Sequence, residues 1–374
     1  MQILPNELIE RILRHVQPVE TQFRLATSLR FLVLRDSLLF GGVIEAATVD
    51  TAAKHGRIEL LDRLFSQREH RDLEFSAAAL DGAAANGHVN TCVWFKKKGL
   101  KLKHSKAAVD WASRNGHIHI LNWWRDNVPT CKYSMNAMDW AAKYNQTDVI
   151  MWWVNESGLP LRYTEALINY ASKNDNIELL RWWFNHYPPL DILYNAKAMD
   201  WASSTRVLDF WKHESGVPHL LWTSGAMDKA SAAGRIDLLQ WWVESGLELK
   251  WKARAIDWAS EKGYNHVLQW WVDSGLRLLY SSWAVDWASQ SGHTHTLEWW
   301  VGSGLELKFS DQSIVLASLN GHVAVLDWWD HHSDVDETIT WEVSPDILSQ
   351  SPQSVLDWWR DRNNRKMKES ESIE

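Results

Sequence analysis

Aspartates recur at a regular interval along most of the chain, and carboxylates are the side chains that carry general acid–base catalysis and bind hard metal ions. Stacked helices lie roughly 10 Å apart, whereas the ligands of one ion lie about 2 to 2.6 Å from it. Each aspartate also falls in the first turn of a predicted helix, where the helix dipole favours a negative charge. We therefore predict that the column starts helices and bonds neighbouring repeats, without catalytic or metal-binding chemistry. Its members are Asp50, Asp81, Asp110, Asp139, Asp200, Asp228, Asp257 and Asp286, with Asn169 in register.

Histidines and cysteines are the other candidates for chemistry. The pairs His117/His119 and His293/His295 suggest zinc, but no Cys or carboxylate follows at the spacing of a closed site, which favours hydrogen bonds to backbone carbonyls. Cys92 and the second cysteine, at position 131, have no Cys-x-x-Cys partner, and the chain contains no phosphate-binding Gly-x-x-x-x-Gly-Lys or Gly-x-Ser-x-Gly elbow. We predict no metal, no cofactor and no enzymatic activity.

Tryptophan pairs mark the same interval, and aromatic side chains can stack on nucleic-acid bases or sugars. In a helix, the second member, such as Trp271, shares a face with Leu268 and Val272, which predicts a core position. The first member is rotated by about 100° and is predicted to lie against the neighbouring repeat. The pairs are Trp123-Trp124, Trp152-Trp153, Trp182-Trp183, Trp241-Trp242, Trp270-Trp271, Trp299-Trp300, Trp328-Trp329 and Trp358-Trp359.

These residues sit in a repeated unit, best seen in Ala255–Gly275, in which two short apolar helical patterns meet at Gly263. A glycine recurs at that turn in most units, and Asn145 and Asp175, which tolerate a left-handed conformation, replace it in two. The pattern predicts an all-α, helix-turn-helix solenoid over residues 43–360, with about ten repeats and a shortened last one. The rhythm breaks at 188–218, and this irregular repeat leaves open whether the solenoid is split there.

The composition of the chain limits the classes of partner and the cell compartment that we expect. The chain has 374 residues, a formal charge of −8 and two cysteines. The acidic balance predicts no nucleic-acid and no membrane partner, because both require a basic field. Few cysteines and no apolar run of about 18 residues predict a cytoplasmic or nuclear protein that is not secreted. We expect a monomer, with a disordered polar tail over 361–374.

Residues 1–40 do not follow the repeat, and an apolar helical stripe is predicted from Leu4 to Val16; the sequence leaves open whether this segment binds a partner or only caps the first repeat. The block Leu4-Pro5-Asn6-Glu7-Leu8-Ile9-Glu10-Arg11-Ile12-Leu13 resembles the opening of an F-box, which implies a small N-terminal helical cap that docks on a Skp-type linker protein. The linker-binding residues that the resemblance implies are Leu4, Pro5, Leu8, Ile9, Ile12 and Leu13.

The repeated unit resembles an ankyrin repeat. Its Ala255-Ile256-Asp257-Trp258-Ala259-Ser260 follows the order of the family's Thr-Pro-Leu-His-Leu-Ala-Ala segment, with Asp257 at the histidine and Trp258 at a core leucine. The units are about four residues shorter than the 33 of the family, and the missing residues fall where ankyrins have a β-hairpin finger. The resemblance implies a concave groove that binds a target protein.

The predicted target-binding surface combines basic residues near the shortened finger with residues just before the turn glycine, which vary between repeats. We interpret the chain as a substrate-recruiting adaptor of a cullin-RING ubiquitin ligase; the alternative is an ankyrin scaffold or sequestering protein without a ubiquitin link. A solvated face is an equal alternative for each surface residue. The candidates are Lys103, Arg114, Asn115, Lys143, Tyr144, Arg162, Lys173, Asn174, Lys250, Glu261, Lys262, Gln290 and Lys308.

Overall fold

The computed structural model describes residues 42–66, 73–186, 189–332 and 343–371, and these ranges contain helices and no strand. The chain divides into two compact units, one up to Ala171 and one from Ser172. The all-α prediction is thereby confirmed. The F-box-like segment 1–40, with its six predicted linker-binding residues, lies outside the described residues.

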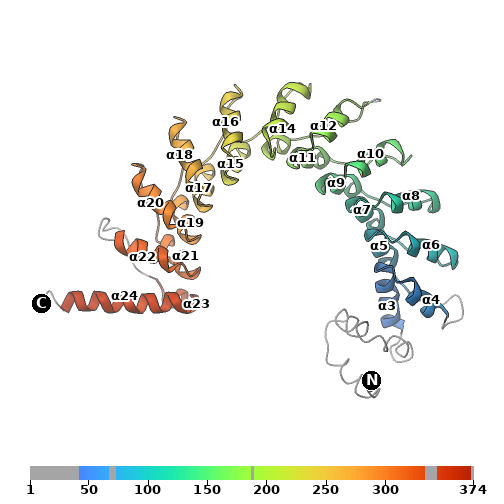
Figure 1. Cartoon of the computed structure of the whole chain (residues 1–374), viewed down its shortest axis with the longest axis horizontal. Helices are drawn as coiled ribbons and strands as arrows, with labels where there is room; N and C mark the ends of the chain where they lie inside the picture. The colour runs from blue at the N-terminus through green and yellow to red at the C-terminus, as the bar shows by residue number, and fades with distance from the viewer. Residues whose placement is uncertain (1–41, 67–72, 187–188, 333–342, 372–374) are drawn as a thin grey trace, which may run out of the picture. The chain divides into compact units, whose positions relative to one another are not determined.

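Helices alternate between a first and a second helix of each repeat, and consecutive first helices lie side by side within each unit (Figure 1). The first unit contains α3 (Gly42–Lys54), α4 (Ile58–Ser66), α5 (Ala77–Ala85), α6 (Val89–Lys97), α7 (Ala107–Arg114), α8 (Ile118–Asn127), α9 (Asn136–Lys143) and α10 (Thr147–Asn155). Helix α11 (Glu165–Lys173) carries the chain across the boundary between the units.

The second unit continues the alternation from α12 onward. It contains α12 (Ile177–Phe184), α13 (Lys197–Asp200), α14 (Thr205–Asp209), the π-helical turn η3 (Phe210–Glu214), α15 (Gly225–Ala232), α16 (Ile236–Glu244), α17 (Arg254–Glu261), α18 (Asn265–Asp273), α19 (Trp283–Gln290), α20 (Thr294–Gly302), α21 (Gln312–Leu319), α22 (Val323–His332), α23 (Pro345–Gln350) and α24 (Gln353–Glu371).

Most first helices end at a left-handed residue, as at Gly263, whose φ is +71°. The Gly263 amide donates to the Ser260 carbonyl, and the Tyr264 amide donates to the Ala259 carbonyl. These two bonds form a Schellman motif, which satisfies carbonyls at the end of the helix. Asn145 and Asp175 adopt φ values of +58° and +55° at the equivalent positions, which confirms that they replace the turn glycine.

The tryptophan pairs behave as predicted. Second members such as Trp271 are fully buried, and the Trp271 indole Nε1 donates to Ser231 Oγ of the preceding repeat at 2.9 Å. First members reach the preceding second helix, as where Trp270 Nε1 donates to Gln240 Oε1 at 3.1 Å. The two rings of a pair pack edge to face, with 5.2 Å between the centroids of Trp270 and Trp271. The pairs therefore hold adjacent repeats together.

The aspartate column also bonds neighbouring repeats, as the sequence predicts. Asp257 Oδ1 accepts from the Ser281 amide at 2.9 Å, and Oδ2 accepts from the Ser281 hydroxyl at 2.8 Å. Ser281 Oγ in turn accepts from the Trp283 amide at the start of the next first helix. The histidines near the turns bond backbone carbonyls, as where His119 Nε2, in the first turn of α8, lies 2.9 Å from the Gly87 carbonyl oxygen.

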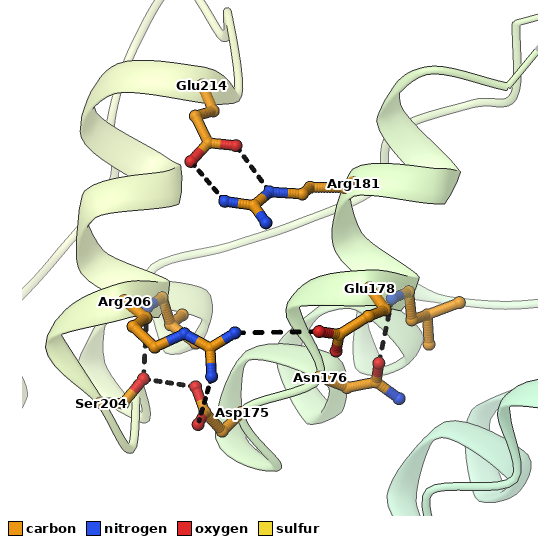
Figure 2. A network of polar contacts seen from close by, with 9 residues as sticks. Asp175, Asn176, Glu178, Arg181, Ser204, Arg206 and Glu214 are labelled. Atoms are coloured by element: carbon orange, nitrogen blue, oxygen red, sulfur yellow. Dashed lines mark hydrogen bonds and ion pairs between the residues drawn. The ribbon is translucent and has the colours of Figure 1, made fainter.

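The irregular repeat has a first helix of four residues, α13, and no left-handed turn glycine before α14. A polar network on the second helices joins it to the preceding repeat (Figure 2). Arg181 forms two bonds with the Glu214 carboxylate, at 2.7 and 2.8 Å, while Arg206 faces Asp175 and Glu178 at 4.0 and 3.8 Å. The guanidinium of Arg181 lowers the pKa of Glu214. These ion pairs supply polar contacts where the regular turn is absent.

The C-terminal end differs from the prediction of a disordered polar tail over 361–374. Helix α24 continues through most of it, to Glu371. Trp358 and Trp359 in its first half bond to Asp327 and Ser318 of earlier repeats. Arg362 is buried and donates to Asp330 at 2.7 Å. These anchors hold the start of a helix whose second half is polar but rich in good helix formers. None of the described helices is long and apolar enough to cross a membrane.

Candidate binding surface on the first helices

A second aromatic column runs along the first helices, one residue after the aspartate column. Because one helical step turns a side chain by about 100°, this position points away from the partner that the aspartate bonds. Trp111 is 38% exposed and the other members are half-buried. The column comprises Trp111, Trp140 and Tyr170 in the first unit, and Trp201, Trp258 and Trp287 in the second.

Cations lie over several rings of this surface. Arg114 lies 4.3 Å from the Tyr144 ring centroid, and Lys143 lies 5.6 and 5.8 Å from the centroids of Tyr144 and Tyr170. In the second unit, Arg254 lies 5.4 Å from the Trp258 centroid. These distances fall within the range of a cation–π interaction. The interactions hold the charged ends of these basic side chains close to the aromatic rings.

One further aromatic ring stacks on this column. The exposed Trp283 ring, at the first residue of α19, stacks on Trp287 with 5.0 Å between centroids and 29° between the planes. Trp283 is 43% exposed, so a flat apolar face remains accessible to a ligand. Exposed tryptophan of this kind is typical of binding surfaces rather than of a solvated helix face.

Charge is separated between the two sets of helices. Apart from the buried aspartate column, first helices α7 to α19 carry six basic and two acidic residues: Arg114, Lys143, Lys173, Lys197, Lys229 and Arg254 against Glu165 and Glu261. Second helices α8 to α20, with η3, carry four basic and nine acidic residues: Arg125, Arg181, Arg206 and Lys212 against Asp126, Asp148, Glu178, Asp209, Glu214, Asp237, Glu244, Asp273 and Glu298. The first-helix surface is therefore basic in an acidic protein.

The predicted target-binding residues divide into two groups. Those before the turn lie at the ends of first helices, on or beside the aromatic column: Arg114, Asn115, Lys143, Tyr144, Lys173, Asn174, Glu261, Lys262 and Gln290. Within this group, Asn115 donates to the Ala85 carbonyl at 2.6 Å, and Lys262 pairs with Glu261 at 2.8 Å.

The predicted residues near the shortened finger have a different environment. Each lies over an aromatic ring of the preceding connection, at 4.6 Å for Lys103 on Phe75, 4.9 Å for Arg162 on Tyr133, 4.6 Å for Lys250 on Trp222 and 4.6 Å for Lys308 on Tyr280. Lys250 and Lys308 also pair with Glu248 and Glu306. These four cations fasten one connection to the next and do not join the first-helix surface.

Sequence reasoning missed the aromatic column itself. It placed Trp258 at a core position, whereas the structure leaves that ring half-buried beside Arg254. A signal was present, because Trp or Tyr follows the aspartate column in six repeats. The tryptophan pairs recur at the same period and were assigned to the core. The single Trp and Tyr residues after the aspartates were not distinguished from them, although their exposure differs. Lys197, Lys229 and Trp283 were also missed.

The remaining candidates for reactive groups are the cysteine thiols and the potential metal ligands. Burial raises the pKa of Cys92 to about 12 and that of Cys131 to about 11, so both thiols are protonated near neutral pH. The described residues contain no group of three or more His, Cys, Asp or Glu side chains placed to hold a metal ion. The arrangement of aromatic and basic groups can bind a ligand, and it defines a helical-repeat binding scaffold.

Comparisons with known proteins gave matches among solved structures alone. No protein-family model and no curated protein matched the chain. The crystal structure of the pentatricopeptide repeat protein PPR10 in complex with an 18-nucleotide psaJ RNA element has 12% identity and a TM-score of 0.39, over 88% of this chain and 58% of that one. The maize PPR10 structure has 15% identity and a TM-score of 0.38, over 89% and 49%. The chain thus spans about half the length of these proteins.

The predicted ankyrin and F-box relationships are wrong: no family model supports them, and the matched structures are pentatricopeptide repeat proteins. The physical reason is that a turn glycine and two apolar helical stripes specify how a two-helix unit packs, and several families share that requirement. The predicted Skp-type linker partner rested on the F-box resemblance and is withdrawn with it.

The predicted exclusion of nucleic acid also does not stand, because the charge of the whole chain does not describe its local surfaces; the RNA in two of the matched structures belongs to complexes of PPR10. The exclusion relied on the charge of the whole chain. That sum conceals a basic first-helix surface and an acidic second-helix surface, and a ligand responds to the local field rather than to the total.

Proposed function

We propose that the chain is a non-catalytic scaffold whose first-helix surface binds single-stranded nucleic acid. The observation that carries the proposal is the column of Trp and Tyr rings accompanied by Arg and Lys. Proteins that bind single strands combine aromatic side chains, on which bases stack, with cations that follow the phosphates. A duplex keeps its bases stacked inside and leaves such rings unused.

A protein target is the competing interpretation, because an acidic peptide would also be attracted to a basic surface. The rings distinguish the two. Every base offers a flat face of matching size, whereas an acidic peptide uses the cations and leaves much of the exposed Trp111 and Trp283 surface unmatched. The cations also lie beside rings rather than apart from them, which favours a ligand with alternating flat and anionic groups.

The test is fluorescence anisotropy with a labelled oligouridine of about 20 nucleotides. Trp111→Ala and Trp258→Ala are each expected to weaken binding by roughly 5- to 150-fold, since a stacked base contributes about 1–3 kcal/mol. Val301→Ala is the matched control, because Val301 is 49% exposed but lies on the second helix α20; it should leave the Kd unchanged.

Three results would contradict the proposal. The first is no binding of the single strand, the second is equal affinity for a duplex of the same length, and the third is displacement of the strand by polyglutamate at equal charge. The third result would favour an acidic protein partner. All variants should first show the same circular dichroism spectrum and urea midpoint as the parent protein.

A further inference from the structure

Trp201, the residue directly after α13, has three ammonium groups around its ring. The distances from Nζ to the ring centroid are 5.6 Å for Lys173, 5.2 Å for Lys197 and 4.9 Å for Lys229. These lysines come from α11, α13 and α15, which belong to three consecutive repeats. No other ring in the described part of the chain has three cations at such distances.

The neighbouring carboxylates do not neutralise this cluster by ion pairing. Asp200 accepts hydrogen bonds from the amide and hydroxyl of Thr223, and Asp228 accepts one from the Lys252 amide. Within the described residues, none of the three lysines forms a salt bridge within 4.0 Å. Both carboxylates therefore bond to the connections between repeats, and all three ammonium groups lie about the Trp201 ring.

The lysines repel one another where they meet. Burial lowers the pKa of Lys229, and the nearby charges of Lys197 and Lys173 lower it further, while Asp200 opposes them. An anion placed between the three groups would relieve this repulsion. Lysine suits a phosphate because the ammonium is a compact charge that needs no fixed bonding direction.

The sequence of the irregular repeat explains why the cluster occurs here. Lys229 occupies the position that holds Trp or Tyr in six repeats, so the repeat after Trp201 contributes a cation where others contribute a ring. Lys197 begins the four-residue helix α13, which places its charge near the indole that follows the same helix. Several other repeats each place a Trp or Tyr ring after the aspartate column, whereas here one ring lies among three cations.

We propose that Trp201, Lys173, Lys197 and Lys229 form an anchoring subsite that takes one nucleotide of the strand, with its base on the indole and its phosphate between the ammonium groups. This inference rests on the proposed function. According to this inference, the irregular repeat binds its nucleotide more tightly than the other repeats do, and the subsites along the surface are not equivalent.

Lys229→Gln and Lys197→Gln test the subsite in the full chain, with the labelled oligouridine as the probe. Each is expected to weaken binding on the order of tenfold, because a charged hydrogen bond is removed, and to lower the slope of log K against log salt by about 0.7. Lys212→Gln is the matched control, since Lys212 lies in η3 among the second helices of the same unit; it should change the Kd by less than about twofold and leave the salt slope unchanged.

The base contact is tested with Trp201→Leu and an abasic strand of equal length. Trp201→Leu should weaken binding of the oligouridine and leave binding of the abasic strand unchanged. Equal losses for Lys229→Gln, Lys197→Gln and Lys212→Gln, while the parent still binds, would overturn the subsite alone. A parent protein that does not bind the oligouridine would overturn the proposed function, and this inference with it.

Discussion

At the scale of single residues, adjacent repeats are joined by hydrogen bonds whose partners recur at fixed separations. In four pairs the indole of the second tryptophan donates to a serine 40 residues earlier, as for Trp153 with Ser113 at 3.1 Å and Trp300 with Ser260 at 2.8 Å. Trp124 shows what happens without the serine. Residue 84 is alanine, and the buried Trp124 Nε1 has no hydrogen-bond partner within the described residues.

Substitution at these two positions should have opposite effects. Ser113→Ala leaves the buried indole of Trp153 unsatisfied and should lower the free energy of unfolding by about 1–3 kcal/mol. Ala84→Ser supplies an acceptor for Trp124 and should raise it by about 0.5–1.5 kcal/mol. Urea unfolding followed by circular dichroism measures both. If both substitutions destabilise equally, packing rather than the indole bond dominates at this position.

The aspartates differ in how completely their oxygens are bonded, and the difference is testable. Asp286 accepts three bonds, from the Ser310 amide, the Ser310 hydroxyl and the Ser313 hydroxyl. Asp228 accepts one from the Lys252 amide, and its Oδ2 has no partner among the described residues. Asp286→Asn should cost about 1–3 kcal/mol at neutral pH, and Asp228→Asn should cost less, as measured by urea unfolding.

The pH dependence of Asp228 has a defined sign. Burial raises its pKa in the folded protein. The folded state therefore binds its proton more tightly than the unfolded state, so this group favours folding below the ordinary aspartate pKa of about 3.9. That contribution is lost as pH rises through the folded pKa. Stability of the parent relative to Asp228→Asn should decrease over this interval; a constant difference would contradict the assignment.

At the scale of elements, the left-handed turn between the two helices of a repeat is also a packing contact. A Cβ added at Gly263 would lie 3.1 Å from the His293 ring of the next repeat, whereas a Cβ at Gly275 meets nothing within 4 Å. Both residues have positive φ, +71° and +68°. The two glycines thus share one backbone requirement and differ in their neighbours.

Comparing the two alanine variants separates backbone strain from packing. Gly275→Ala should lower the free energy of unfolding by about 1–2 kcal/mol, because alanine is strained in the left-handed conformation. Gly263→Ala should lower the free energy of unfolding by more, because the His293 ring must also move. Thermal and urea unfolding of the two variants measure the difference. Equal losses would show that the histidine ring adapts without cost.

At the scale of the whole molecule, repeats within each unit bond to their neighbours at constant offsets, so each unit is a series of nearest-neighbour interfaces. Removing residues 255–283 would join Arg254 to Ala284 and keep the register of both columns. Trp300 would then occupy the place of Trp271, opposite Ser231. The shortened chain should keep its helix content per residue and unfold cooperatively at lower stability.

The control is removal of residues 269–283, which joins a second helix to a first helix and breaks the alternation. That variant should lose cooperative unfolding, as measured by circular dichroism and differential scanning calorimetry. Cooperative unfolding of the control, or collapse of the in-register deletion, would contradict a nearest-neighbour description of the solenoid.

The sequence by itself determined the features that depend on a short, repeated stretch of chain. The helix-turn-helix unit, the left-handed turn at Asn145 and Asp175, the burial of Trp271 and the inter-repeat role of Asp257 all follow from local periodicity. Each requires a residue type at a fixed offset, and the same offset recurs in most repeats. Periodicity can therefore predict these features without the position of any other repeat.

Tertiary structure alone decided which surfaces the remaining residues share. Trp258 is half-buried, and Lys173, Lys197 and Lys229 meet at Trp201 because three successive first helices bring them there. Total charge likewise gives no indication that cations collect on first helices and carboxylates on second helices. Such groupings depend on distances between repeats, and these are set by side-chain packing rather than by spacing along the chain.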